Sequence, residues 1–278
     1  MSLTLTWLAA TSLPVDGAPL RPDSLLGLGL DEVRRVSLKV GNRPAELGEL
    51  FEVRGDDGGD DRLTVVGDLR GVRGIARGMT AGDLVVRGDA GPELGAEMAG
   101  GTIELHGSAG PYAGAEMRGG RLVIRGAAGD FLGAAYPGSR TGMRDGVILV
   151  DGTAGDDVGS LMRRGLIAVR GDAGEGLGRS MIAGTVVALG DVGRGLGAGM
   201  KRGSLVLPGL STPPESVLPP TFERAGAFSA PFLAIYSRQM AAWGFEVPPE
   251  VSSRSLDRYN GDVLIGGRGE VLAGLRGG

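Results

Sequence analysis

The sequence predicts an all-β chain folded as a right-handed parallel β-helix. Each repeat reads G-x-x-G-x-x-x-G, then Met, then Gly, then a five-residue strand of alternating character. Glycines close the repeats at intervals of 19 residues in two runs, Gly88, Gly107, Gly126 and then Gly152, Gly171, Gly190, Gly209. A period near 20 residues is typical of a solenoid, in which each repeat buries its apolar face only against its neighbours.

Residues at equivalent positions of the repeats form columns, and these columns indicate where each repeat has its strand and its corner. The residues four and two positions before the closing glycine are apolar: Leu84/Val86, Ile103/Leu105, Leu122/Ile124, Ile148/Val150, Ile167/Val169, Val186/Ala188 and Leu205/Leu207. A two-residue period with one apolar face indicates a strand rather than a helix. The methionine that recurs in each repeat is predicted to fill the corner, because a flexible thioether packs well there.

We expect three segments along the chain: 1–62, 63–210 and 211–278. Residues 1–62 lack the repeat but contain three candidate strands, at 3–7, 35–40 and 50–53. An N-terminal β cap is expected here, since the end of a solenoid must be shielded from edge-to-edge pairing. The β-helix itself is expected over 63–210, where the repeats lie.

After Leu210 the repeat ends and a different composition begins. Prolines at 213–214 and 219–220 predict an extended linker, and a helix is expected between Pro231 and Gly244. We expect one side of this helix to be apolar, formed by Phe232, Ile235, Tyr236, Met240 and Trp243. The tail from Arg258 to Leu272 is predicted to form a closing turn and strand.

Composition excludes several classes of function. The net charge of −4 argues against a general nucleic-acid surface, and the chain contains no cysteine for disulfides, Fe–S clusters or thiolate metal sites. No apolar run approaches the ~18 residues of a membrane span. The sequence is therefore expected to be that of a cytoplasmic protein with no membrane or nucleic-acid partner.

An apolar column on the outward side of the strands predicts a contact surface. Six of its seven residues are apolar, the exception being Glu104: Val85, Glu104, Val123, Leu149, Ala168, Val187 and Val206. From it we select Val85, Val123, Leu149 and Val187 as candidate interface residues, since an exposed apolar stripe usually marks a binding surface. The alternative is that the C-terminal segment of the same chain covers the stripe.

Two further features are candidate contact sites. One is a seven-residue insertion, which contains Tyr136 and Arg140; a long loop on a regular solenoid often carries a specific contact, although a tolerated surface insertion is equally consistent. The other is the position before the closing glycine, where Arg87, Arg125 and Arg170 stand. This column suits either an anionic ligand or a solvated rim.

The sequence offers little for catalysis. It has one histidine, His106, and no nucleophile-elbow motif G-x-S-x-G or phosphate-loop motif G-x-x-x-x-G-K-[ST]. One adjacent acidic pair, Asp156 and Asp157, is too little for a calcium site or an acid/base pair. We therefore predict no catalytic residue, no metal site and no cofactor bound by this chain itself.

Several motifs resemble one family. The repeat resembles the C-terminal domain of the glutamate synthase large subunit, and four features resemble the C subunit of formylmethanofuran dehydrogenase and of the related bacterial formyltransferase/hydrolase complex. These are 48–53 (GELFEV), the loop from Tyr136 to Met143, the repeats that begin at Gly152 and Gly171, and the tail from Arg258 to Glu270. The resemblance covers nearly the whole chain.

The resemblance implies a scaffold subunit whose partners perform the chemistry. Those partners are a formyltransferase subunit, an amidohydrolase-like metal-binding subunit and a further subunit. The implied reaction passes a formyl group from formyl-tetrahydromethanopterin to a methanofuran-type carrier and releases formate, in the oxidation of formaldehyde. The alternatives are the C subunit of a molybdenum or tungsten formylmethanofuran dehydrogenase, a stand-alone glutamate-synthase-like domain, and an autonomous β-helix hydrolase.

The resemblance also implies a role for the arginines. Methanofuran-type carriers of this family have glutamate-rich tails, which makes Arg87, Arg125, Arg140 and Arg170 candidate residues for guiding such a tail between active sites.

Overall fold

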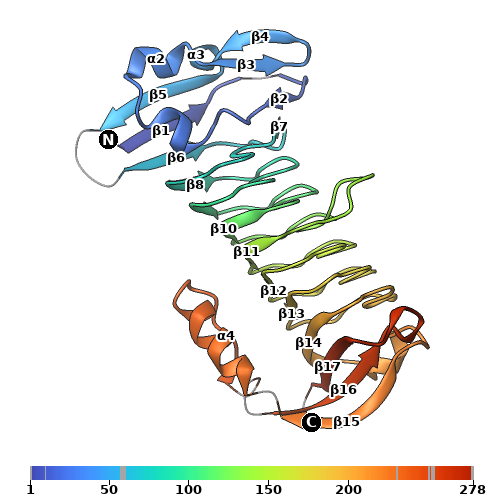
Figure 1. Cartoon of the computed structure of the whole chain (residues 1–278). Helices are drawn as coiled ribbons and strands as arrows, with labels where there is room; N and C mark the ends of the chain where they lie inside the picture. Colours follow the sequence, from blue (N-terminus) through green and yellow to red (C-terminus); the bar gives the residue numbers. More distant parts are fainter. Residues whose placement is uncertain are drawn as a thin grey trace.

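Strands dominate the structure, as the sequence predicts. They form one 13-stranded sheet with both parallel and antiparallel neighbours and a second sheet of four strands. The computed structural model of the chain describes residues 2–9, 11–56, 61–229, 231–249, 251 and 254–276. The repeats stack along one axis, with the N-terminal strands at one end of the stack and the C-terminal strands at the other (Figure 1).

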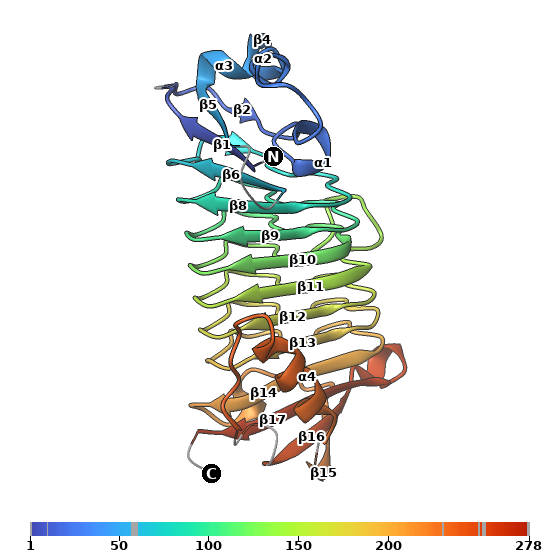
Figure 2. The ribbon, with the colours of Figure 1, turned by 90° about the vertical axis from the view of Figure 1, so that its left-hand side faces the viewer.

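Each repeat contributes one strand to the large sheet. The strands are β6 (Arg62–Val66), β8 (Asp83–Arg87), β9 (Thr102–Leu105), β10 (Arg118–Ile124), β11 (Asp145–Val150), β12 (Leu166–Val169), β13 (Thr185–Ala188) and β14 (Gly203–Leu210). Neighbours pair in parallel with equivalent residues opposite each other, as Leu122 lies between Ile103 and Ile148. Figure 2 shows this ladder face on. Equivalent positions of successive sequence repeats are therefore the residues that pair across the sheet.

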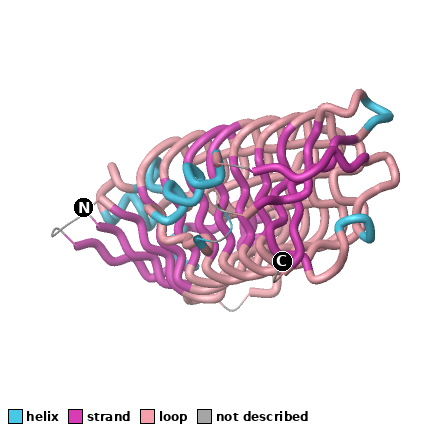
Figure 3. The backbone as a smooth tube through the Cα atoms, turned by 90° about the horizontal axis from the view of Figure 1, so that it is seen from below, coloured by secondary structure: helices cyan, strands magenta, loops and turns pink. Residues whose placement is uncertain are grey.

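The inward-facing columns form the core of the stack. All fourteen residues of the apolar pairs from Leu84/Val86 to Leu205/Leu207 are at most 1% exposed. The seven corner methionines, from Met79 to Met200, are completely buried. The predictions of an apolar inner face and of methionines that fill the corners are both confirmed. The strands lie on one side of the stack, and loops form the opposite side (Figure 3).

The closing glycines are required because adjacent repeats meet there through their backbones. A Cβ atom at Gly107 would lie 2.3 Å from the carbonyl oxygen of Gly88, and one at Gly88 would lie 2.0 Å from that of Gly67. Just after these glycines, single-residue parallel bridges join Leu69, Ala90, Ala109, Ala128, Ala154, Ala173 and Val192. Small residues at these corners therefore let successive repeats approach to hydrogen-bonding distance.

The N-terminal segment contains the three predicted strands and three short helices that were not predicted. Strand β1 (Ser2–Trp7) runs parallel to β6, and β5 (Phe51–Asp56) pairs antiparallel with β1 at the edge of the sheet. The four-stranded sheet contains β2 (Val15–Asp16), β3 (Ser37–Val40), β4 (Arg43–Glu46) and β7 (Val72–Arg73). The helices are α1 (Pro22–Leu25), α2 (Leu30–Arg34) and α3 (Leu47–Leu50).

The C-terminal segment adds three strands to the other end of the sheet, where the sequence predicts one. They are β15 (Glu223–Ser229), β16 (Ser255–Gly261) and β17 (Gly269–Leu275). Strand β17 runs parallel to β14, and the other two follow as an antiparallel ladder. The predicted linker contains a turn of 3-10 helix, η1 (Pro214–Ser216), and a second one, η2 (Val263–Ile265), precedes β17.

The predicted helix forms as α4 (Phe232–Ala241) and lies over the outer face of the large sheet (Figure 2). Leu233, Met240 and Phe245 are buried there, and Phe232, Tyr236 and Trp243 pack around them. The prediction was wrong for Ile235, which is 68% exposed, because Leu233 faces the sheet in its place. No helix in the described part of the chain is long and apolar enough to cross a membrane.

Candidate functional site

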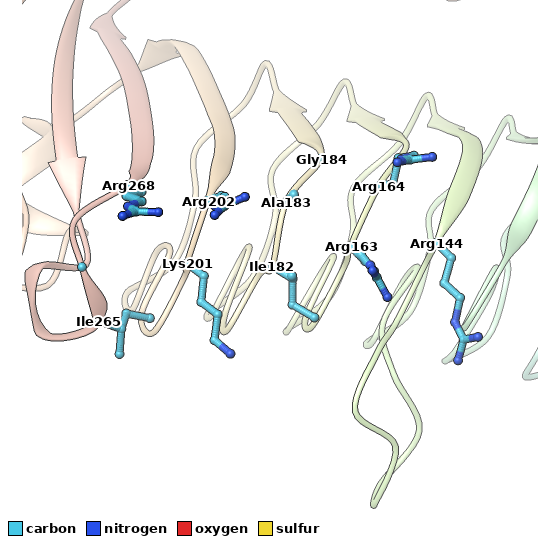
Figure 4. A pocket seen from close by; sticks show the side chains of 11 residues that line it. Arg144, Arg163, Arg164, Ile182, Ala183, Gly184, Lys201, Arg202, Ile265 and Arg268 are labelled. Atoms are coloured by element: carbon cyan, nitrogen blue, oxygen red, sulfur yellow. The ribbon is translucent and has the colours of Figure 1, made fainter.

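A groove lined by basic side chains runs across the corners of the last repeats. Its volume is about 920 Å³, and its basic residues are Arg144, Arg163, Arg164, Lys201, Arg202 and Arg268. They stand immediately before the starts of β11, β12, β14 and β17. Figure 4 shows their side chains following one another along the stack. We call this feature the basic groove.

The position after the buried methionine explains why these side chains line up. The backbone N–H of Arg144 donates to the carbonyl of Met117, that of Arg163 to Met143 and that of Lys201 to Met181, over 2.7, 2.8 and 2.7 Å. This hydrogen bond recurs at one place in each repeat, so equivalent residues stack at the strand spacing of about 4.8 Å. The methionine faces inward and the next residue therefore faces solvent.

The charges of the basic groove are not neutralised by the described part of the chain. None of its six basic side chains forms an ion pair or hydrogen bond with a residue that the structure describes. Stacked like charges repel one another and attract an anion from solution. Arginine is well suited to carboxylate and phosphate groups, since its planar fork of donors matches both.

One end of the basic groove is apolar. Ile265 lines it, and the consecutive side chains of Val263, Leu264 and Ile265 in η2 are 46%, 78% and 43% exposed. Asp262 fixes this turn, because its buried carboxylate accepts hydrogen bonds from the N–H groups of Leu264 and Gly199 over 3.0 and 3.1 Å. We call the three side chains the apolar rim.

A second hollow of about 400 Å³ continues the basic groove toward α4. It shares Arg164 and Gly184 with the groove and is also lined by Thr185 and by Tyr236 and Gln239 of the helix. The surface available to a ligand therefore extends from η2, across the starts of the strands, to the edge of α4.

The structure places the four predicted arginines in different surroundings. Arg125 pairs with Glu104 and Asp151 over 2.9 and 3.1 Å, and Arg170 pairs with Asp151 over 3.1 Å. Burial acts to lower the pKa of Arg125, but the two carboxylates outweigh it and the pKa is raised. Arg87 and Arg140 make no ion pair within the described ranges.

Arg125 and Arg170 also attach the C-terminal segment to the sheet. Arg125 donates to the carbonyl of Gly244 over 3.4 Å, and Arg170 donates to that of Glu246 over 2.7 Å. The guanidinium of Arg170 lies 4.6 Å from the ring centre of Phe245, a cation–π distance. These two side chains therefore hold the segment that follows α4 in place.

The predicted interface residues fall into three groups. Val123, Leu149 and Val187 lie in the apolar cluster under α4, which corresponds to covering by the chain itself. Val85 is buried, at 8% exposure, outside that cluster. Tyr136 lies on the long loop, stacked on Tyr112 with ring centres 5.4 Å apart.

The long loop folds back along the stack. The N–H of Tyr136 donates to Glu116 over 3.3 Å. Its half-buried position raises the pKa of the phenol to about 12, and the negative charge of Glu93 contributes to this shift. Glu93 is itself buried and accepts hydrogen bonds from Arg73 and Arg77. The loop is thus packed against the repeats that precede it.

The single histidine of the chain has one acidic neighbour. The imidazole of His106 is about half exposed and lies 3.7 Å from the carboxylate of Glu104. Among the residues that the structure describes, no group of three or more His, Asp and Glu side chains is arranged to hold a metal ion.

Sequence reasoning missed the basic groove. The signal was present, since the residue after the methionine is Arg118, Arg144, Arg163 and Lys201 in four of the seven repeats. The column is interrupted, because Thr80, Ala99 and Ile182 occupy the same position in the other three repeats, and Arg268 precedes the closing strand rather than belonging to a repeat.

Comparison with known proteins gives a family match and several relatives. The GXGXG motif family matches residues 71–210. The C subunit of molybdenum-containing formylmethanofuran dehydrogenase 1 from Methanothermobacter thermautotrophicus is 38% identical over 83 residues, 30% of this chain and 21% of the relative. The C subunit of tungsten-containing formylmethanofuran dehydrogenase 2 from the same organism is 36% identical over 87 residues, 30% of this chain and 32% of the relative. The match thus spans less than a third of either relative.

A solved structure matches over almost the full length. It is a chain in the crystal structure of the formyltransferase/hydrolase complex (FhcABCD) from Methylorubrum extorquens in complex with methylofuran. The TM-score is 0.85 at 34% sequence identity, with 97% of this chain and 98% of that chain covered. The chain therefore belongs to the GXGXG motif family, in the group that comprises the C subunits of formylmethanofuran dehydrogenases and a chain of the formyltransferase/hydrolase complex.

Proposed function

We propose that the chain is a scaffold subunit of a formyltransferase/hydrolase complex in one-carbon metabolism. The complex would pass the formyl group of formyl-tetrahydromethanopterin to a methanofuran-type carrier and release formate. The observation that carries this proposal is the agreement with a chain of the solved complex over 97% of the residues at 34% identity. Agreement at both ends matters, because the repeats alone are shared by the wider family.

The proposed division of labour assigns the chemistry to partner subunits. They would be a formyltransferase subunit, an amidohydrolase-like metal-binding subunit and a further subunit, all in the cytoplasm. In this proposal the stacked repeats are a right-handed parallel β-helix between an N-terminal and a C-terminal cap. Its support is the parallel register of β6 through β14 and the added strands at both edges of the sheet.

A contact with the carrier is part of the proposal. Since Arg125 and Arg170 are neutralised by carboxylates, an anionic carrier tail would be guided by Arg87 and Arg140. We expect Arg87→Gln/Arg140→Gln to raise the KM for the carrier in the assembled complex several-fold with kcat unchanged. An unchanged KM would remove these two residues from the proposal.

The first experiment is affinity purification of the tagged full chain from its native host, followed by mass spectrometry of the bound proteins. We expect a formyltransferase and an amidohydrolase-like subunit in constant ratio to the chain. The purified complex should release formate from formyl-tetrahydromethanopterin only when a methanofuran-type carrier is present.

A second candidate function is that of the C subunit of a molybdenum or tungsten formylmethanofuran dehydrogenase. The 38% identity over 83 residues to the corresponding subunit of the molybdenum enzyme favours it. The same purification separates the two, because molybdopterin and Fe–S subunits would co-purify in that case. A chain purified as a monomer would contradict both functions.

A further inference from the structure

The basic groove is suited to an occupant with several negative charges. Its six cations lie on a chain whose net charge is −4, and none is balanced by a described side chain. The protein as a whole is acidic and does not attract anions. Attraction of an anion to the basic groove would therefore come from this local cluster of cations. Five of its six cations are arginines, and these suit carboxylate groups in particular.

The length of the basic groove suits an extended occupant. Its basic residues come from the layers of β11, β12, β14 and β17, and the layer of β13 lies between them. Four spacings of the sheet separate the first layer from the last, about 19 Å in total. A single small anion reaches only part of this length, whereas about six residues of extended peptide span it.

The apolar rim distinguishes among extended polyanions. Ile265 lines the end of the basic groove and is 43% exposed, and Leu264, which precedes it in η2, is 78% exposed. The groove is lined by no aromatic side chain, within the described residues, on which a nucleic-acid base would stack. A protein segment combines carboxylates with an apolar side chain, so it complements both the cations and the rim.

We infer that the basic groove docks an extended acidic segment of a partner protein, with its carboxylates on the six basic side chains and an apolar residue on the rim. The inference rests on the proposed function, since it takes the chain to be one subunit of a larger complex.

The direct test measures peptide binding to the purified full chain by fluorescence anisotropy. The probes are labelled hexaglutamate and hexaglutamate with two leucines at its N-terminal or C-terminal end. We expect one leucine-tipped peptide to bind at least 10-fold more tightly than plain hexaglutamate. Arg163→Glu/Lys201→Glu should weaken its binding by at least 100-fold, and Leu264→Ser/Ile265→Ser should remove the gain due to the leucines.

The matched control reverses two exposed charges far from the basic groove. Arg35→Glu/Arg43→Glu changes the net charge by the same amount, so it should leave the affinity within about 2-fold. Equal weakening by both double variants would overturn the inference. So would tight binding of plain hexaglutamate that the leucines do not improve, or equal competition by single-stranded RNA, since either result would indicate a generic polyanion site.

Purification of the variants from the host separates this inference from the proposed function. We expect Arg163→Glu/Lys201→Glu to lose one subunit of the complex while the others remain bound. If the wild type yields the complex and the variant retains every subunit, the inference fails and the proposed function stands. If the wild type yields no complex, the proposed function fails and the inference fails with it.

Discussion

Glu93 occupies a corner where the backbone is left-handed, with φ at +68°. Gly74 and Gly176 take the equivalent place in other repeats, at φ of +71° in both. A residue with a Cβ is strained in this region, and Glu93 is retained there with its buried carboxylate between the guanidiniums of Arg73 and Arg77. Tyr112, Phe131 and Asp157 also have a left-handed backbone at the equivalent place, but only Glu93 forms an ion-pair cluster with Arg73 and Arg77 there.

The long loop has a tyrosine whose titration reports its packing. Burial raises the pKa of Tyr136 to about 12, and an exposed tyrosine titrates near 10. Since the folded pKa is the higher one, the stability contribution is complete below about pH 10 and is lost as the pH rises toward 12. Absorbance at ~295 nm, recorded as wild type minus Tyr136→Phe, should show a midpoint near 12. A midpoint near 10 would mean that the loop does not pack on Tyr112.

The closing glycines predict a steep difference between two glycine-to-alanine variants. Gly107→Ala places a Cβ 2.3 Å from a backbone oxygen of the neighbouring repeat, and Gly71→Ala meets nothing within 4 Å. We expect the first to lower the free energy of unfolding by about 3 kcal/mol or more and the second by less than about 1. Denaturant unfolding of both variants measures this, and equal losses would show that the repeats can move apart.

Among the elements, α4 has the largest effect on the surface of the molecule. Together with Phe245, which follows it, and Leu256 and Leu272 of the closing strands, it forms the cluster that buries Val123, Leu149, Val187 and Val206 to at most 4% exposure. Without this helix the outer face of the sheet would present a continuous apolar patch, of the kind that causes association. The hydrogen bonds that Arg125 and Arg170 donate hold the chain segment that follows the helix.

The dependence of α4 on its apolar contacts can be tested. Leu233→Ser/Met240→Ser should detach the helix and leave the repeats folded, because the inner core does not involve these side chains. We expect loss of amide protection over 232–245 alone, together with increased binding of a hydrophobic dye. Ile235→Ser is the matched control, since that side chain is already 68% exposed. Loss of protection throughout the stack would contradict this independence.

What could be predicted from the sequence depended on periodicity. The strands and corner methionines recur every 19 residues, as Met98 and Met117 illustrate. Each repeat therefore supports the assignment of the others. Helices α1, α2 and α3 have four or five residues, too few for an apolar stripe to appear. Ile235 was misplaced because a ten-residue helix permits more than one apolar face, and only contact with the sheet selects one.

Over the whole molecule, charge is unevenly distributed. The chain has a net charge of −4, yet six cations without a described partner lie in the basic groove. In the absence of a ligand these cations repel one another, so the arrangement lowers the stability of the free chain in favour of binding.

Neutralising part of the basic groove should therefore stabilise the free chain. We expect Arg163→Ser/Lys201→Ser to raise Tm by about 2 °C at low ionic strength, and ~1 M salt should abolish the difference by screening. Arg35→Ser/Arg43→Ser, which removes the same charge elsewhere, should not raise Tm. Thermal unfolding monitored by circular dichroism distinguishes these cases, and a lower Tm for the groove variant would show that its cations are structural.

The two ends of the large sheet are built from different strands, β5 and β1 at one edge and β16 and β15 at the other, while the strands from β6 to β14 pair in parallel. Inserting or deleting one whole repeat would leave both ends intact and would change their separation by one step of about 4.8 Å. The length of the molecule therefore changes only in steps of one repeat. The number of repeats sets the distance between any two partners that bind its two ends.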